Sequence, residues 1–307
     1  MDSVSTILSP SAKSRSADLS ELSVEERIVH FYEEAGQDYE HWSPGLNMHL
    51  GFYRWGMNPF DREAMLEQLN HEIAKRLQLP SVTGTFLIDL GCGMGAVSRT
   101  VAKCYPNAKI KGVTLAPSQV RIASERNKIS GLEKQIEILE ADYVDLPFRS
   151  GAADGVWAVE SACYASGSGK EDLVAEMSRV LKAGRRFVVA DCFVRDPERR
   201  FNPLIGRLYN AACRNWAVLE MAALEDFVAA LKKNGFRDIE VEDVSWQAAP
   251  SLAHAPLAVM TFLLKKMWVG ERIKQQSLNN LKASLLALIL GMNRSKISYC
   301  LISGTRD

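Results

Sequence analysis

The stretch Phe86-Leu87-Ile88-Asp89-Leu90-Gly91-Cys92-Gly93-Met94-Gly95 decides the fold of this chain. It is an apolar run that contains one acid and is followed by three glycines on alternate positions, and an amphipathic segment from Val97 to Cys104 comes next. We interpret the run as a buried parallel strand and the glycines as a sharp turn into a helix. Because glycine has no Cβ, this turn can pass close to a ligand that carries a ribose or a phosphate.

The glycines alone are compatible with two classes of cofactor. The spacing Gly91-x-Gly93-x-x-Ala96 fits a loose dinucleotide fingerprint. A dinucleotide site usually also has an acid about 20 residues further on, at the end of the second strand. Residues 108–119, which contain that strand, have no Asp or Glu. A carboxylate at Asp89 would also repel a pyrophosphate, so the turn suits a cationic ligand better.

The acid-x-Gly-x-Gly-x-Gly pattern of residues 89–95 resembles motif I of the class I S-adenosylmethionine (SAM) dependent methyltransferases. Residues 112–119, Gly-Val-Thr-Leu-Ala-Pro-Ser-Gln, are similar to the matching segment of the cyclopropane-fatty-acid, sterol and tocopherol branch. The resemblance implies an α/β, Rossmann-like fold with a seven-stranded, mostly parallel sheet and helices on both faces. It also implies SAM as the cofactor and S-adenosyl-L-homocysteine as its product.

The bulk composition limits the partners of the protein. The chain has 307 residues and a formal net charge of zero, which argues against a nucleic-acid substrate. Its six cysteines include no CxxC pair, so we expect free thiols in a reducing compartment and no metal site. We see no signal peptide and no apolar run near the ~20 residues of a membrane span, although a transit peptide is an alternative that Asp2 and Asp18 disfavour. We therefore expect a cytoplasmic protein that is not stably inserted in a membrane.

Apolar runs alternate with helical patterns after residue 84, which predicts a parallel sheet covered on both faces. The expected strands are Phe86–Leu90, Lys109–Thr114, Ile136–Ala141, Gly155–Glu160, Phe187–Asp191, Asp238–Val244 and Ile297–Ser303. Helices are expected between Pro117 and Gly131, after a capping box at Ser168-x-x-Glu171, and from Leu224 to Lys233. Residues 196–221 look irregular.

The chain divides into four expected parts. Residues 1–21 are a serine-rich disordered tail, 22–80 an N-terminal helical lid, 81–195 the SAM-binding core, and 196–307 an acceptor-binding cap that contributes the last two strands. About fifty residues, 246–296, separate those two strands, which is too long for a hairpin loop. We expect this insert to cover the acceptor, while its apolar stretch 285–290 is alternatively a contact in a homo-oligomer.

The resemblance also implies which residues hold the cofactor. Asp89 and the glycine turn suit the methionine end of SAM by charge and close approach, although Asp89 is alternatively an N-cap of the next helix. Residues 37–42 and 47–53 are similar to N-terminal elements that close over the cofactor, and residues 142–143 match the adenine-binding position. The expected cofactor-binding residues are Tyr39, Asp89, Gly91, Gly93, Gly95, Thr114, Leu115, Gln119, Asp142, Tyr143 and Glu160.

Residues 160–164 are similar to a Glu-Ser-x-x-His element, but Tyr164 stands where histidine is usual. Histidine is the commonest base for methylation of a hydroxyl or amine, whereas an alkene needs no base before it attacks. Aromatic faces stabilise the resulting carbocation by roughly 0.5–2 kcal/mol each. We therefore expect catalytic roles for Glu160, Tyr164 and His49, and acceptor contacts from Trp55, Phe201, Tyr209 and Trp246. Each of these aromatic residues alternatively fills core space.

These observations favour a C-methyltransferase that acts on an olefinic carbon of a lipophilic prenylated or terpenoid natural product. Residues 47–60 and the insert also resemble prenyl-indole C-methyltransferases, which implies carbocation-driven ring closure after methylation. One alternative is an O- or N-methyltransferase that uses His49 or His41 as the base. Another is a SAM-binding module without catalysis that serves a partner subunit through residues 285–290.

Overall fold

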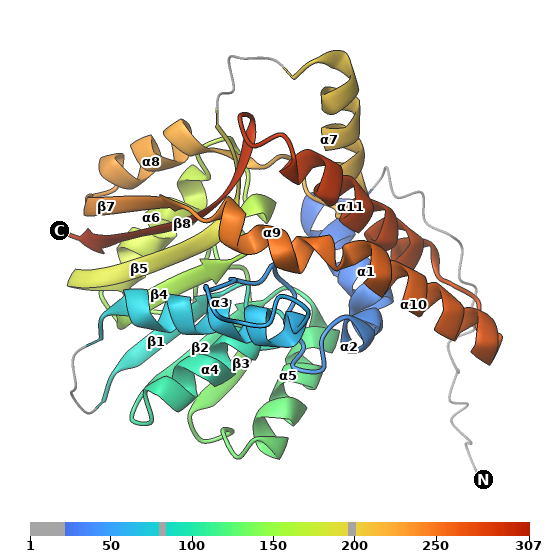
Figure 1. The fold of residues 1–307 in the computed structure, drawn as a ribbon. Coiled ribbons are helices and arrows are strands. Elements are labelled where there is room, and N and C mark those ends of the chain that lie inside the picture. Colours follow the sequence, from blue (N-terminus) through green and yellow to red (C-terminus); the bar gives the residue numbers. More distant parts are fainter. Residues whose placement is uncertain (1–21, 80–83, 196–200) are drawn as a thin grey trace, which may run out of the picture.

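A twisted sheet forms the centre of the computed structural model, which describes residues 22–79, 84–195 and 201–307 (Figure 1). Its strands are β1 (Phe86–Leu90), β2 (Lys109–Thr114), β3 (Ile136–Glu140), β4 (Ala153–Val159), β5 (Leu181–Val194), β6 (Ala222–Ala223), β7 (Phe236–Asp243) and β8 (Ile297–Arg306). Seven strands follow the order β3-β2-β1-β4-β5-β8-β7, and the short β6 pairs with β5. The strands pair in parallel, except that β8 is antiparallel to both β5 and β7.

The expected Rossmann-like fold with a mostly parallel sheet is confirmed, and the reversed strand β8 lies between β5 and β7. The bounds of β1 and β2 are those expected, while β5 and β8 extend further. One departure is β6, a two-residue strand that makes an eighth member of the sheet. Every residue of β4 except Val159 is buried, as a strand covered on both faces requires.

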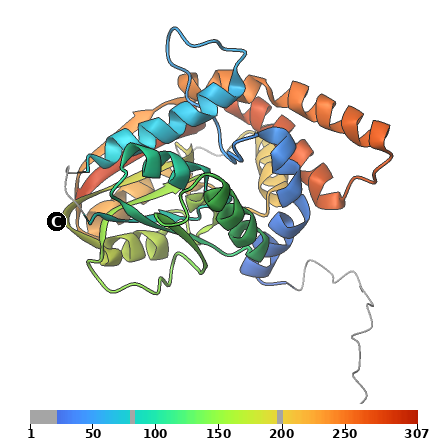
Figure 2. The same ribbon diagram turned by 90° about the horizontal axis from the view of Figure 1, so that it is seen from below.

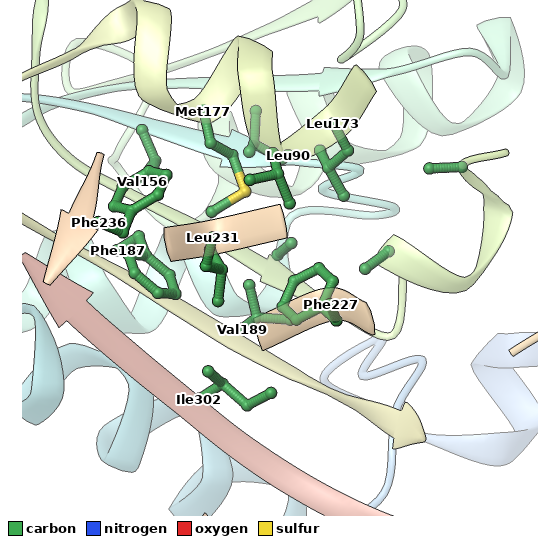
Figure 3. Close-up of a cluster of buried hydrophobic side chains, with 14 of the residues drawn as sticks. Leu90, Val156, Leu173, Met177, Phe187, Val189, Phe227, Leu231, Phe236 and Ile302 are labelled. Atoms are coloured by element: carbon green, nitrogen blue, oxygen red, sulfur yellow. The ribbon is translucent and has the colours of Figure 1, made fainter. Parts of the chain in front are cut away.

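Helices cover both faces of the sheet. One face carries α3 (Arg62–Leu77), α4 (Ala96–Cys104) and α5 (Pro117–Ile129), and the other carries α6 (Glu171–Val180) and α8 (Leu224–Lys233). Figure 3 shows the hydrophobic core between the sheet and the second pair of helices, α6 and α8. There Met177 of α6 and Leu231 of α8 approach Phe187 and Val189 of β5. Because α3 buries Leu69 and Ile73 completely against the sheet, it belongs to the core and not to the N-terminal lid.

The remaining helices gather at the carboxyl ends of the parallel strands (Figures 1 and 2). They are α1 (Val24–Ala35), α2 (Tyr39–Trp42), α7 (Pro203–Asn215), α9 (Ser245–Ala253), α10 (Ala255–Val269) and α11 (Gln275–Gly291). The two short 3₁₀ turns are η1 (Gly36–Asp38) and η2 (Ala162–Tyr164). In open α/β sheets the ligand lies at this end of the strands.

Two local expectations were wrong. Ser168 does not cap α6, because its hydroxyl donates a 2.6 Å hydrogen bond to Asp226 and Lys170 is the N-cap residue instead. The stretch that looked irregular contains α7, with Asn202 as N-cap and Pro203 in the first turn. The Asn-Pro pair is a start signal for a helix, and the aromatic content of this stretch obscured it. The expected tail, residues 1–21, lies outside the described residues.

In the described part of the chain, one helical stretch, Ser245–Val269, is long and apolar enough to cross a membrane by length and composition alone. It has 25 residues, and a window of 18 residues within it has a mean hydropathy of 1.2. His254 divides it into α9 and α10, and its start packs in the protein: Ala248 of α9 belongs to the core beside α3.

Candidate active site

The glycine turn after β1 adopts a backbone that side chains rarely allow. Gly91 and Gly93 have φ values of +73° and +51°, and a Cβ at position 91 would collide with the side chain of Ser161. Both glycines line a narrow cleft of about 80 Å³. Gly95, with φ +75°, is the N-cap of α4 and does not line the cleft. The first two glycines therefore let the side chains of Ser161 and Met48 approach the turn at the wall of the cleft, and the third completes the turn.

Asp89 lies at the floor of this cleft and is 2% exposed. Its Oδ2 accepts a 2.7 Å hydrogen bond from the Ser98 hydroxyl in α4. Burial raises the pKa of Asp89 to about 7, although the hydrogen bond from Ser98 opposes this. The carboxylate thus anchors the first turn of α4 without being its N-cap, and it also suits a cationic ligand.

The end of β2 and the start of α5 form the next wall. Thr114, Leu115 and Gln119 line the cleft, and the Thr114 hydroxyl donates a 2.6 Å hydrogen bond to Gln119 Oε1. Tyr143 also lines the cleft, and its hydroxyl donates to the Ser161 carbonyl at 2.9 Å. Asp142 does not line it: its Oδ1 accepts a hydrogen bond from the Val144 amide at 3.0 Å.

A larger cavity of about 430 Å³ adjoins the cleft. Segments from α9, α11, α2 and the start of β8 contribute to its walls, and most of the lining is apolar or aromatic. The residues that line both spaces are Tyr32, Met48, His49, Glu160 and Tyr164. The two spaces therefore meet at these five side chains, where a group bound in one would face a molecule bound in the other.

Glu160 follows β4 at this junction, with a left-handed backbone of φ +47°. Its Oε1 accepts hydrogen bonds from the Leu50 amide at 2.6 Å and from the Tyr299 hydroxyl at 2.9 Å. Burial, reinforced by the charge of Asp191, raises the pKa of Glu160 to about 8 against these two hydrogen bonds. Within the described residues the other carboxylate oxygen has no hydrogen-bond partner, so it is free to accept a proton.

Two tyrosines and a histidine complete the junction. The hydroxyls of Tyr32 and Tyr164 lie 2.9 Å apart, and Tyr164 also donates to the Trp216 carbonyl at 3.1 Å. His49 is 7% exposed, and its Nδ1 donates to the Leu50 carbonyl at 2.8 Å. Burial lowers the pKa of His49, so the ring is neutral near pH 7 and its Nε2 carries a lone pair.

Three of the four expected acceptor contacts do not line the cavity, which corrects the expectation. Trp55 is 97% exposed on a loop. Phe201 and Tyr209 stack on each other at 5.0 Å between ring centroids, in a separate core cluster next to α11. Trp246 does line the cavity, but it is 72% exposed and stacks against Arg294, with the guanidinium carbon 4.2 Å from the ring centroid. Tyr39, expected at the cofactor, lines the larger cavity instead.

The structure also adds residues that sequence reasoning missed. Tyr32, Arg62 and Tyr299 line the larger cavity, from α1, α3 and β8. Apolar residues 285–290, an alternative oligomer contact, contribute Ala287, Leu288 and Leu290 to the cavity wall. A signal for Tyr299 existed, because a tyrosine in a strand that is otherwise buried and aliphatic needs a hydrogen-bond partner.

The chain is similar in sequence to known methyltransferases. Residues 87–184 match the family described as methyltransferase domain. Methyltransferase phqN of Penicillium fellutanum is 30% identical over 57% of this chain and 52% of its own length, so the match spans about half of that protein. Tocopherol O-methyltransferase of Arabidopsis thaliana is 26% identical over 90% of this chain and 80% of its own length. The 24-methylenesterol C-methyltransferase 2 from the same plant is 26% identical over 65% of this chain and 56% of its own length.

Solved structures share the fold. The [4+2]-cyclase SpnF superimposes with a TM-score of 0.70 at 21% identity and covers 92% of this chain and 96% of its own. Geranyl diphosphate C-methyltransferase from Streptomyces coelicolor A3(2) was solved with Mg²⁺, geranyl diphosphate and S-adenosyl-L-homocysteine. It superimposes with a TM-score of 0.69 at 16% identity and covers 94% of this chain and 99% of its own. At these identities the likeness concerns the fold.

Proposed function

Since this chain is a class I SAM-dependent methyltransferase, we propose that it methylates an olefinic carbon of a lipophilic prenylated or terpenoid natural product. One observation carries the proposal: a large, mostly apolar cavity with aromatic walls meets the cofactor cleft at a buried carboxylate, Glu160. Such a cavity suits a lipophilic acceptor, and its aromatic walls suit a cationic intermediate of that acceptor.

The cleft residues fit the cofactor. We assign Asp89 and the amides around Gly91 and Gly93 to the methionine end, where a buried carboxylate faces a cation and no Cβ blocks close approach. Thr114 and Gln119 suit the ribose hydroxyls, and the ring of Tyr143 suits the adenine. When bound, SAM supplies an electrophilic methyl group on a positively charged sulfur.

The walls near the junction suit an acceptor that becomes positively charged. The π electrons of the alkene would form the new carbon–carbon bond to the methyl group as the bond between that methyl group and the cofactor sulfur breaks. Its electron pair would stay on the sulfur, and the positive charge would pass to the neighbouring acceptor carbon. Faces of the aromatic side chains that line the larger cavity stabilise that charge by roughly 0.5–2 kcal/mol each. These aromatic residues are Tyr32, Tyr39, Trp42, Tyr164, Trp216, Trp246 and Tyr299.

Glu160 then has a specific task. Loss of a proton from a carbon next to the cation restores a double bond, and the free oxygen of Glu160 is placed to accept that proton. Where a nucleophilic ring carbon of the acceptor lies nearer, it captures the cation first and the protein removes the proton afterwards. Ring closure would follow in that case.

The charges of the cavity favour an acceptor without a diphosphate. Two guanidinium groups, those of Arg62 and Arg294, line it. Arg294 pairs with Asp243 at 3.4 Å, while Arg62 stacks 4.1 Å from the centroid of Trp42 and has no ion pair among the described residues. One unpaired guanidinium suits a single carbonyl or hydroxyl group better than a diphosphate.

A second function has its own observation. The buried, neutral ring of His49 lines both spaces, and its Nε2 has no hydrogen-bond partner among the described residues. A base in that place would serve methylation of a hydroxyl or amine. The O-methyltransferases among the relatives agree with this alternative.

Mass spectrometry with trideuteromethyl-labelled SAM tests the proposal. The purified protein would be incubated with prenylated indoles, prenylated phenols, sterols, tocopherols and geranyl diphosphate, with His49→Gln run in parallel. We expect label on a prenyl carbon, located by NMR, and similar turnover by His49→Gln. If the label is found only on oxygen or nitrogen, and His49→Gln transfers no label, the protein is instead a methyltransferase of hydroxyls or amines that uses His49 as its base.

A further inference from the structure

Helix α10 is apolar on two opposite sides. Val259 and Phe262 are buried against α11 through Leu281. The other side exposes Leu257, Met260, Leu264, Met267 and Trp268, which are between 51% and 91% exposed. At 100° per residue these five side chains fall within an arc of about 100°, opposite the buried side. A helix that is apolar on two opposite sides is normally covered on both. In the described structure the outer stripe of α10 is uncovered, so it lacks a partner there.

A neighbouring loop extends the same surface. Trp55 and Phe60 are 97% and 84% exposed, and the loop that carries them lies on the same side of the molecule as α10 (Figures 1 and 2). His254, at the start of α10, ties the two together through a 2.8 Å hydrogen bond from its Nε2 to the Pro59 carbonyl. We call the five α10 residues, Trp55 and Phe60 the apolar face.

The charge of this region differs from that of the chain. The whole sequence has no net charge, but residues 244–306 contain eight Lys or Arg residues and one acid, Glu271. Lys265, Arg272 and Lys274 are exposed at the outer end of α10 and in the following turn. Glu271 is occupied by an ion pair with Lys266 at 2.6 Å. The α10 part of the apolar face is therefore bordered by exposed positive side chains.

We propose that the apolar face docks on the surface of a bilayer that contains anionic lipids. The apolar stripe with its exposed tryptophan enters the interface, and Lys265, Arg272 and Lys274 attract the negative lipid headgroups. The mode is interfacial, because α10 has 15 residues and spans about 22 Å, short of the ~30 Å of a hydrocarbon core. The preceding α9 packs into the protein and does not extend it.

Charge also decides between a bilayer and a second copy of this chain. A two-fold contact through the apolar face would bring the same patch of each copy together. Lys265, Arg272 and Lys274 would then meet residues 244–306 of the other copy, where the one acid, Glu271, is already paired with Lys266, so the contact offers these charges no opposite partner there. An anionic bilayer offers the opposite sign and an apolar interior at the same time.

Vesicle co-sedimentation of the full chain tests the proposal. Phosphatidylcholine vesicles would be compared with vesicles that contain about 30% phosphatidylserine, at low and high salt. We expect binding to the anionic vesicles that weakens with salt. The double variant Leu264→Glu with Trp268→Glu should bind at least about tenfold more weakly, and Lys265→Gln with Arg272→Gln about fivefold more weakly per charge removed.

The matched control is Ile129→Glu with Leu204→Glu, which places the same charges on exposed apolar positions of α5 and α7, 70% and 64% exposed. It should bind vesicles like the wild type. Thermal melting and light scattering after gel filtration would show that each variant is folded and in which oligomeric state. Absence of binding to any vesicle, or unchanged binding of the Leu264 and Trp268 variant, overturns the proposal. A mass that falls from oligomer to monomer in that variant, without vesicle binding, assigns the face to a second copy.

Discussion

The Tyr299 hydroxyl donates a 2.9 Å hydrogen bond to Glu160 Oε1, joining two residues that are 139 positions apart. The same oxygen accepts the Leu50 amide at 2.6 Å, so the N-terminal segment, the end of β4 and the last strand converge on one carboxylate. Both donors use Oε1, which leaves the other oxygen toward the space where cleft and cavity meet. The position of this carboxylate is therefore fixed by the whole fold and not by its neighbours in sequence.

Replacement of Glu160 by glutamine should abolish proton removal and preserve the geometry. The amide oxygen still accepts from Leu50 and Tyr299, but the side chain no longer takes up a proton. We expect turnover of an olefinic acceptor to fall about 10²–10⁴-fold, with affinity for S-adenosyl-L-homocysteine within about threefold of the wild type. Single-turnover kinetics and calorimetry would measure the two quantities. Turnover within about threefold of the wild type would remove Glu160 from the reaction.

The pH dependence follows from the same group. A base whose pKa is about 8 in the free protein is protonated, and inactive, below that pH. We therefore expect kcat/KM to rise about tenfold per pH unit up to about 8 and to level off above it. The measurement is a pH–rate profile at low acceptor concentration. A limb near the pKa of histidine that disappears in His49→Gln would point to His49 instead.

Stability should change with pH in the opposite direction. Burial raises the pKa of Glu160 from 4.5 to about 8, so the folded state binds the proton more tightly than the unfolded state does. The free energy of unfolding is then highest below pH 4.5 as far as this group is concerned, and it decreases as pH rises toward 8. Glu160→Gln lacks this decrease. We expect it to gain about 1–3 kcal/mol over the wild type between pH 5 and pH 9, measured by urea unfolding.

Two variants at position 164 separate the roles of ring and hydroxyl. Tyr164→Phe keeps the aromatic face but removes the partner of Tyr32, so we expect a stability loss of about 1 kcal/mol and turnover within about threefold of the wild type. Tyr164→Leu also removes the face, and turnover of an olefin should fall by a further factor of about 2–30. Equal kinetic losses in both variants would assign the role to the hydroxyl.

The cofactor half of the site could be predicted from sequence because it is local. An apolar run, an acid and three glycines within ten residues specify a strand, a turn and a helix, and the bounds of β1 follow from this pattern. Those of β2 follow from a second apolar run. The left-handed φ values of Gly91 and Gly93 are a direct consequence of residue type. What remained unpredictable there is the rotation of single side chains, such as Asp142, which turns to the Val144 amide.

The acceptor half was less predictable because tertiary packing builds it. Trp55 and Trp216 are both tryptophans outside the core motifs, yet one is 97% exposed and the other lines the cavity. Nothing in their neighbourhoods specifies this difference, since it depends on where α9 and α11 fold back over the strand ends. The partnership of Glu160 with Tyr299 is of the same kind: it becomes visible only when β8 lies beside β5.

A matched pair of glycines isolates the role of the turn. Gly91 and Gly131 have similar φ values, +73° and +68°, so alanine introduces comparable backbone strain of about 1–3 kcal/mol at either site. A Cβ at position 131 meets open space, whereas one at position 91 collides with Ser161 inside the cofactor cleft. We expect Gly91→Ala to lose cofactor affinity by at least about tenfold and Gly131→Ala to keep it, by calorimetry. Equal affinities would show that the turn does not approach the cofactor.

The two tryptophans provide the last test of the aromatic wall. Trp216 lines the cavity, and its indole Nε1 donates to Asn280 Oδ1 at 2.9 Å, which fixes the ring. Trp216→Leu removes a face that stabilises a cation by roughly 0.5–2 kcal/mol, so turnover of an olefin should fall about 2–30-fold. Trp55→Leu changes an exposed ring that touches neither cavity, and in a vesicle-free assay its turnover should stay within about twofold of the wild type. Because both variants remove one tryptophan, a comparable loss in each would show that the rings act through stability and not through the acceptor.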